Sequence, residues 1–540
     1  MLDLRLREPV LARALRDLAL PLGAYLLLFA ALTWPLLCSF GRAYWCDEGD
    51  GLANAWNIRQ VERWAAGEVP LRFTGELHFP HGCTLAGHTL ALLDGLLAIP
   101  LGRALGPVGA FDALVLLAFT GSGLTAFWLC RQAGARRGPS LVGGAVFGCS
   151  SYLFAHAEGH LNLITAQALP LFAAALVALC ARPGPLRALL AAGALALVGL
   201  SELSYAFYAG LLAGLWLLGR AAREGRGEWR DPARLRAMGL FGLASAAVAL
   251  GLGWPLLAAA SGDELLGRHS STVYALDLLG LVVPGGHWRF ASLTAWHWSR
   301  LEANIHETSV HLGLGVLALV ALAWRRRRDL PAATPWLVVF AGAVVLALGP
   351  RLHVAGWEVP VLRLPYKLLE GASSTVRLSG MPIRIVLVAT LAAAVLSALA
   401  LGWLLERGPR ARWLAGGLLL LALVEHLPRP LPRSSPAAPA WVLALRDLPP
   451  GAAIDAVSQG GRLHYHQTLH GKPLAFGHLA RLPRSVWEQD QALARRLEAG
   501  DVAALASAGF RWVVLPPDRA LAGEVVHEDA DARIVRLGSR

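Results

Sequence analysis

Long apolar runs separated by short clusters of arginine are the feature that most limits how this chain can fold. Only 16% of its 540 residues are charged, whereas soluble domains carry about 25%. A run of about 20 apolar residues can cross a bilayer as a helix, because a helix satisfies its backbone hydrogen bonds internally. The sequence therefore predicts a mainly α protein built as a polytopic transmembrane bundle.

The arginine clusters predict how the bundle is oriented. Basic residues in short loops stay on the cytoplasmic side, and here they recur in every second loop. This pattern predicts a multi-pass protein of the inner (plasma) membrane with a cytoplasmic N-terminus and an extracytoplasmic C-terminus. A net charge of +12 spread in this way gives no basic face, so we expect no nucleic-acid partner. About eleven spans are expected, at residues 18–40, 107–130, 139–155, 162–181, 186–202, 205–220, 237–260, 309–324, 332–349, 383–405 and 411–427.

The composition changes after residue 427. Closely spaced prolines begin at Pro428 and predict a stiff, extended linker over residues 428–445. The expected organisation is a transmembrane domain over residues 1–427 and a small extracytoplasmic α/β domain over residues 446–540.

Short patterns support the α/β assignment of the tail. Residues 452–457 and 511–515 are typical of buried strands, and residues 525–537 can add one or two more. Residues 488–508 have the periodicity of an amphipathic helix. In the membrane domain, the apolar segment 90–105 is short, and we expect it to lie in the membrane plane or to re-enter it.

Three carboxylates follow the first span within four positions: Asp47, Glu48 and Asp50. A carboxylate at a membrane-facing cleft can act as a general base that takes a proton from an acceptor hydroxyl. It can also hold a hard divalent cation against a phosphate, which leaves Mg²⁺ or Mn²⁺ open as a cofactor with no residue assigned as its ligand. A solvated acidic loop is the alternative interpretation.

Histidines recur in the loops on the same predicted side: His81, His88, His156 and His160. His156 and His160 are four residues apart, so on a helix they would share one face. Their imidazoles can bind phosphate oxygens or sugar hydroxyls, or they can be surface histidines without a ligand. A zinc pair is the least favoured interpretation, because the H-E-x-x-H pattern is absent.

Three charged residues lie close to span ends. Glu202 falls between two spans that nearly touch, and a carboxylate at such depth usually lines a cavity. Arg377 and Arg384 break the positive-inside trend and suit a lipid phosphate or diphosphate. The alternative is that such arginines extend towards lipid headgroups.

Two cysteines, Cys46 and Cys83, share the first predicted outer loop. An extracytoplasmic location is oxidising in a bacterial envelope, so a disulfide between them is a further hypothesis.

Several short motifs occur in a fixed order along nearly the whole chain. They are Gly49-Asp50-Gly51, Trp56-Asn57, Phe79-Pro80-His81-Gly82, Gly159-His160-Leu161-Asn162, Leu364-Pro365-Tyr366, Arg377 with Pro382 and Arg384, and His470-Gly471-Lys472-Pro473. In this order the sequence resembles the multi-spanning GT-C glycosyltransferases, which use polyprenyl-phosphate-linked sugars, and most closely a poorly characterised bacterial branch.

The resemblance implies a catalytic aspartate in the first outer loop, with Asp50 favoured over Asp47. It implies a polyprenyl-phosphate-linked sugar donor, an envelope glycan or lipid acceptor, and contact with membrane lipids. The expected activity is transfer of a hexosyl or pentosyl group at the outer face, with the tail shaping the acceptor side. The residues predicted to bind substrate are Glu48, His81, His88, His156, His160, Glu202, Arg377 and Arg384.

Two other functions remain open at the level of sequence. A transporter or flippase of lipid-linked glycan would be expected to show inverted repeats and ionisable residues in the middle of its spans. We find no convincing repeat, and the spans are almost free of charge. A non-catalytic scaffold for envelope assembly is the third possibility.

Overall fold

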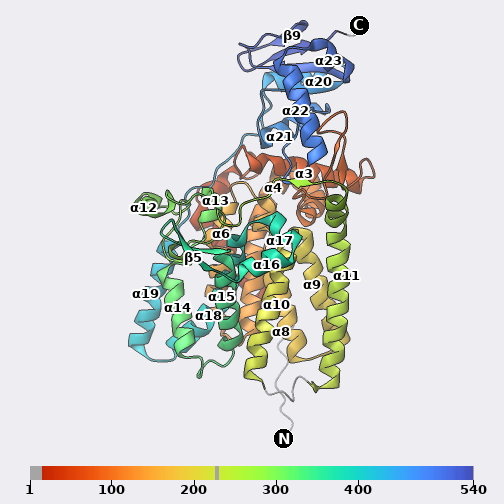
Figure 1. Ribbon diagram of the computed structural model, residues 1–540. Coiled ribbons are helices and arrows are strands. Elements are labelled where there is room, and N and C mark those ends of the chain that lie inside the picture. Colours follow the sequence, from red (N-terminus) through yellow and green to blue (C-terminus); the bar gives the residue numbers. More distant parts are fainter. Residues whose placement is uncertain (1–14, 225–229, 539–540) are drawn as a thin grey trace.

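The computed structural model describes residues 15–224 and 230–538 (Figure 1). The start of the basic N-terminal segment and part of the basic loop at 220–236 lie outside the described residues. The predicted sidedness of the membrane domain, which uses both, therefore stays a prediction.

The membrane part is a bundle of apolar helices (Figure 1). Each predicted span overlaps one of its helices, and six helical stretches in the described residues are long and apolar enough to cross a membrane. The predicted polytopic helical bundle is thus confirmed. Its helices are α2 (Leu20–Thr33), α4 (Leu92–Gln132), α5 (Arg137–Gly148), α8 (Ala168–Ala181), α9 (Pro185–Ser201), α10 (Leu203–Arg223), α11 (Pro232–Gly262), α14 (Gly313–Arg325), α15 (Ala333–Ala347), α18 (Val386–Leu405) and α19 (Pro409–Glu425).

Helices α18 and α11 show the two extremes of burial. The most apolar window of the stretch that contains α18 is 94% buried, whereas that of α11 is 0% buried. Small residues let neighbouring helices approach α18 closely: a side chain at Gly143 of α5 would meet the Ala394 carbonyl oxygen at 2.9 Å. Helix α18 is therefore central, and α11 presents its apolar surface to lipid.

Helix α4 is divided at Gly106, whose φ of 73° is non-helical and favours glycine. The short apolar segment predicted at 90–105 is the first part of this helix, and the predicted span follows the division at Pro107.

Short elements cover one end of the bundle. They are α3 (Asp50–Ala65), β1 (Phe73–Thr74), β2 (Cys83–Thr84), α6 (Ser151–His156), α7 (Leu161–Ile164), β3 (Leu265–Leu266), α12 (Ala295–Trp298), α13 (Ile305–Thr308), β4 (Arg351–Val354), β5 (Trp357–Arg363), α16 (Tyr366–Ala372) and α17 (Ser374–Ser379), together with the 3-10 turn η6 (Pro382–Ile385) before α18.

The C-terminal part is a small α/β domain that lies beyond these elements (Figure 1). Its sheet has the strand order β6-β8-β10-β9, in which β6 and β8 are parallel and the other pairs antiparallel. The strands are β6 (Ala452–Asp455), β8 (Phe510–Leu515), β9 (Glu524–Glu528) and β10 (Arg533–Arg536), with β7 (Leu482–Pro483) apart from them. The helices are α20 (Ala440–Asp447), α21 (Gly461–His470), α22 (Arg484–Glu498) and α23 (Val502–Ser507).

The predicted helix at 488–508 is two helices, because Gly500 adopts a φ of 66° between them. The extended segment after the bundle ends at Pro439, and α20 begins at Ala440, so the last part of the predicted linker 428–445 is helical.

The C-terminal domain is held against the bundle end at two places. Helix α21 packs on α3, where the Trp56 indole donates to the Gln467 side chain at 3.1 Å and a side chain at Gly461 would collide with the Gly49 carbonyl. Strand β3 pairs with β7 through Leu265 and Pro483. The helix that begins at Asp50 is therefore fixed directly to the soluble domain.

The disulfide hypothesis is wrong in this structure, since Cys46 and Cys83 are both free and buried. Cys46 packs in the main apolar cluster, where its side chain lies against Gly51. Cys83 is paired instead in the β1–β2 ladder opposite Thr74.

Candidate active site

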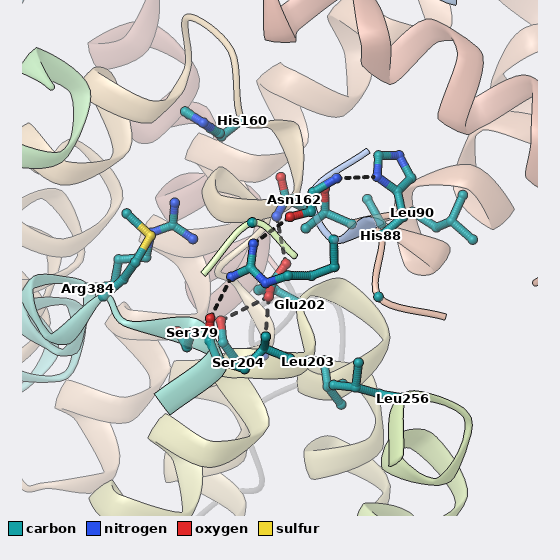
Figure 2. Close-up of a pocket in the computed structure, with 18 of the residues that line it drawn as sticks. His88, Leu90, His160, Asn162, Glu202, Leu203, Ser204, Leu256, Ser379 and Arg384 are labelled. Atoms are coloured by element: carbon teal, nitrogen blue, oxygen red, sulfur yellow. Dashed lines mark hydrogen bonds between the residues drawn. The ribbon is translucent and has the colours of Figure 1, made fainter. Parts of the chain in front are cut away.

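A cavity of about 590 Å³ lies between the bundle end and the C-terminal domain. Small-molecule sites usually enclose roughly 300–1,000 Å³. Its lining comes from α3, the loop before α4, the junction of α9 and α10, α17 and the loop between α21 and β7. Figure 2 shows His160, Glu202 and Arg384 around this space, with Leu256 of α11 at its apolar side.

Of the three carboxylates that follow the first predicted span, Asp50 is the one that lines the cavity. It begins α3, and its side chain is 54% exposed. Its two oxygens lie 3.8 Å from Nε2 of His160 and 3.6 Å from Nε2 of His478. Asp50 is thus flanked by two imidazoles and stays accessible to a ligand.

Asp47 has a different environment and does not line the cavity. Its Oδ1 accepts a hydrogen bond of 2.8 Å from the Gly51 N–H in the first turn of α3. Burial raises its pKa. Asp47 therefore stabilises the start of α3, whereas Asp50 remains accessible to a ligand in the cavity.

The predicted histidine pair lies behind Asp50. Nδ1 of His160 is 3.4 Å from Nδ1 of His156, and Nε2 of His156 is 3.7 Å from the Glu307 carboxylate. His160 lines the cavity, whereas His156 is fully buried behind it. Burial lowers the pKa of His160 to about 4, so at neutral pH it offers a hydrogen bond and not a positive charge.

Arg384 lines the cavity but is already paired. Its Nε donates to both Glu307 oxygens at 3.1 Å, and its Nη2 donates to Oε1 at 2.5 Å. Burial would raise the pKa of Glu307, but the charges of Arg384 and the hydrogen bonds outweigh it and hold that pKa at about 2. Glu307 is 1% exposed, so this is a closed, buried ion pair.

Glu202 also lines the cavity with its oxygens in use (Figure 2). It accepts a hydrogen bond of 2.6 Å from the Asn162 amide. It accepts another of 2.9 Å from the Ser204 hydroxyl. Glu202 thus lines a cavity where one was expected, and Asn162 from the histidine motif is its partner.

His88 joins the segment between α3 and α4 to the C-terminal domain. Its Nδ1 accepts from the Ala480 N–H at 3.3 Å, so its Nε2 carries the proton and donates to the Asn57 side chain at 2.9 Å. Burial lowers the pKa of His88 to about 3, in keeping with a neutral ring. His88 therefore positions the loop that carries Ala480 at the cavity edge.

Besides His156, three predicted substrate-binding residues do not line the cavity. Glu48 forms an ion pair with Arg462 at the surface. His81 and Arg377 are exposed. Their proposed roles gain no support from the geometry.

Sequence reasoning missed three residues that belong to the site: Glu307, His478 and Arg481. Glu307 is the partner of Arg384, which the sequence did predict. A search for carboxylates next to predicted spans could have identified Glu307 as a candidate. His478 and Arg481 lie in the tail, more than 400 positions after Asp50. No local pattern there indicates contact with the membrane domain.

One cluster in the described residues could offer metal ligands. Atoms of Glu158, His287 and His306 lie within 4.8 Å of one another. However, Arg429 donates to both Glu158 oxygens at 2.7 and 2.6 Å and lies 3.2 Å from Nε2 of His287. A guanidinium already fills this position, and Mg²⁺ and Mn²⁺ prefer oxygen ligands, so the cluster fits neither ion.

Solved structures with a similar fold are membrane enzymes. The archaeal oligosaccharyltransferase AglB from Archaeoglobus fulgidus, solved with an inhibitory peptide and a dolichol-phosphate, has a TM-score of 0.51 and 10% identity over 91% of this chain and 69% of that chain. The arabinofuranosyltransferase AftD from Mycobacteria has a TM-score of 0.60 and 17% identity over 97% of this chain and 42% of that chain. ArnT from Cupriavidus metallidurans, bound to undecaprenyl phosphate, has a TM-score of 0.50 and 14% identity over 98% of this chain and 99% of that chain.

At these identities the likeness establishes a shared fold, and it agrees with the predicted polytopic helical architecture of a membrane protein. No curated protein matches the sequence. A family model matches residues 22–425, which include Asp50, His160 and Arg384. The protein therefore belongs to the family described as a domain of unknown function, DUF6311.

Proposed function

We propose that the protein transfers a sugar from a polyprenyl-phosphate-linked donor to a cell-envelope acceptor on the outer face of the inner membrane. The observation that carries this proposal is Asp50, an accessible carboxylate that faces a cavity also lined by arginines. A base and a cationic phosphate site within one cavity are what such a transfer requires.

The cavity also reaches lipid. Leu252 and Leu256 of α11 contribute to its lining, and the most apolar stretch of α11 has none of its residues buried by the rest of the protein. A polyprenyl chain can therefore lie along this apolar side while the sugar phosphate enters the polar part. The lipid phosphates named for AglB and ArnT are consistent with a donor of this class.

In the proposed reaction Asp50 accepts the proton of the acceptor hydroxyl. The acceptor oxygen then bonds to the anomeric carbon of the sugar, and the bond from that carbon to the phosphate oxygen breaks. Polyprenyl phosphate leaves with the electron pair and carries the negative charge. One imidazole lies near each Asp50 oxygen, Nε2 of His160 at 3.8 Å and Nε2 of His478 at 3.6 Å.

The test uses full-length protein in nanodiscs and a panel of polyprenyl-phosphate hexoses and pentoses, with an envelope extract as acceptor. We expect release of free polyprenyl phosphate from at least one donor, and a fall in kcat of about 10²- to 10⁴-fold for Asp50→Asn, the usual range for a lost general base. Glu48→Gln, which lies outside the cavity, is the control and should retain activity. Absence of release with every donor would favour a lipid-glycan transporter or a scaffold instead.

A further inference from the structure

The arginines that line the cavity differ in whether their charge is already neutralised. The arginines in the lining are Arg72, Arg384 and Arg481. Arg384 is bound by the buried Glu307 carboxylate through three hydrogen bonds. A phosphate at Arg384 would have to compete with a carboxylate that cannot move to water, because it is 1% exposed.

In the part of the chain that the structure describes, the Arg481 guanidinium donates hydrogen bonds only to backbone carbonyls. Its Nη1 donates to the Ala480 carbonyl at 2.6 Å and its Nη2 to the Leu378 carbonyl at 3.1 Å. Within the described residues no carboxylate forms an ion pair with it. Glu202 is the one acidic group whose charge reaches it, and the oxygens of Glu202 already accept from Asn162 and Ser204.

The environment of Arg481 is short of negative charge. Burial and the neighbouring charge of Arg384 lower its pKa, and only Glu202 acts in the other direction. The carbonyl contacts fix the plane of the guanidinium without neutralising it. A fixed guanidinium with unused donors is suited to an incoming phosphate.

The position of Arg481 is built into the chain around it. Its loop is fixed by the Ala480 N–H, which donates to His88, and by the His478 N–H, which donates to Nε2 of His464 at 2.9 Å. Gly87 lies against it so closely that a side chain there would come within 2.7 Å of the Arg481 Cβ. The loop before α4 thus carries a glycine where the arginine approaches.

We propose that Arg481, and not Arg384, supplies the positive charge that holds the donor phosphate, so that the C-terminal domain completes the donor site. This inference rests on the proposed function. It replaces the expectation that Arg377 and Arg384 bind the phosphate, and it adds a donor role to the tail, which was expected to shape the acceptor side. The packing of α21 on α3 joins the domain that carries Arg481 to the helix that begins at Asp50.

The experiment measures equilibrium binding of undecaprenyl phosphate to the full-length protein in nanodiscs, with undecaprenol as the phosphate-free probe. For Arg481→Gln we expect an affinity for undecaprenyl phosphate about 10- to 100-fold lower, the effect of one lost charge-assisted contact, and unchanged binding of undecaprenol. Arg481→Lys should retain most of the preference for the phosphate. Arg519→Gln is the matched control, since Arg519 also donates to a backbone carbonyl in the same domain but lies outside the cavity.

Two further variants test whether the position of Arg481 matters and whether another cavity arginine can account for the binding. Gly87→Ala leaves the charge in place but displaces Arg481, and it should weaken binding of the phosphate without affecting undecaprenol. Arg72→Gln tests the other cavity arginine without a carboxylate partner in the described residues. The inference fails if Arg481→Gln binds undecaprenyl phosphate like the wild type, if Arg72→Gln or Arg384→Gln loses more of the phosphate preference, or if the wild type shows no such preference.

Failure of this inference can be told apart from failure of the proposed function. Turnover by the wild type with an unchanged donor KM in Arg481→Gln would overturn the role of Arg481 and leave the transfer reaction intact. Binding of undecaprenyl phosphate that depends on Arg481, without turnover of any sugar donor, would support Arg481 and overturn the transfer.

Discussion

The two walls of the cavity differ in how their charges are paired. We call Glu202, Glu307 and Arg384 the inner wall and Asp50, His478 and Arg481 the outer wall. Every charged group of the inner wall is hydrogen-bonded to another side chain. On the outer wall Asp50 is 54% exposed and His478 is 61% exposed, and their closest approach is 3.6 Å.

This difference distinguishes residues that stabilise the fold from residues that are available for ligand binding and catalysis. A buried charge without a partner destabilises the folded protein, and each charged group of the inner wall has a hydrogen-bonded side-chain partner. The outer wall keeps charges without close partners, and such groups in a cavity are candidates for ligand binding and catalysis. Residues of the inner wall should therefore affect stability most, and residues of the outer wall should affect turnover and binding most.

The largest expected effect on stability comes from breaking the inner-wall ion pair. Glu307→Gln leaves Arg384 buried without a counter-charge, and we expect the free energy of unfolding to fall by about 3–5 kcal/mol. Thermal unfolding in nanodiscs measures it, with Asp50→Asn as the outer-wall control that should melt like the wild type. Equal loss of stability in both variants would break the distinction between the walls.

Acid should act on the same wall. Glu307 has a pKa of about 2 in the folded protein against about 4.5 when unfolded, so its contribution is complete above about pH 4.5 and is lost as the pH falls towards 2. The melting temperature of the wild type should fall through this window. Glu158 has a similarly lowered pKa of about 2, so Glu307→Gln should reduce the slope without removing it. An unchanged slope in that variant would contradict the assignment.

The smallest effect is expected at Asp47. Its carboxylate accepts one backbone hydrogen bond at the start of α3, so Asp47→Ala should cost about 1 kcal/mol of stability. Donor turnover should fall far less than in Asp50→Asn, because Asp47 does not line the cavity. Melting curves and kcat measured on both variants sharpen the comparison. A greater loss of kcat in Asp47→Ala than in Asp50→Asn would reverse the roles of the two aspartates.

Prediction from the sequence succeeded where the cause is local. Each expected span overlaps a helix, because hydropathy and helix length act within one stretch of chain. The depth of Glu202 between two spans also indicated a cavity, and Glu202 lines it. His160 and Arg384 line the same cavity, whereas Arg377, only seven positions from Arg384, is exposed. Short spacing along the chain could not separate those two arginines.

The sequence by itself determined a membrane bundle with an acidic turn at the end of its first span, since the solvent dictates apolar length and excludes charge. Only the tertiary structure decided which charges are neutralised. Glu307 and Arg384 are 77 positions apart and His478 follows Asp50 by 428, so no pattern along the chain links either pair. Whether a charge is neutralised or available to a ligand depends on the neighbours that folding brings within hydrogen-bond distance. Arg384 has a carboxylate as such a neighbour, whereas Arg481 has backbone carbonyls.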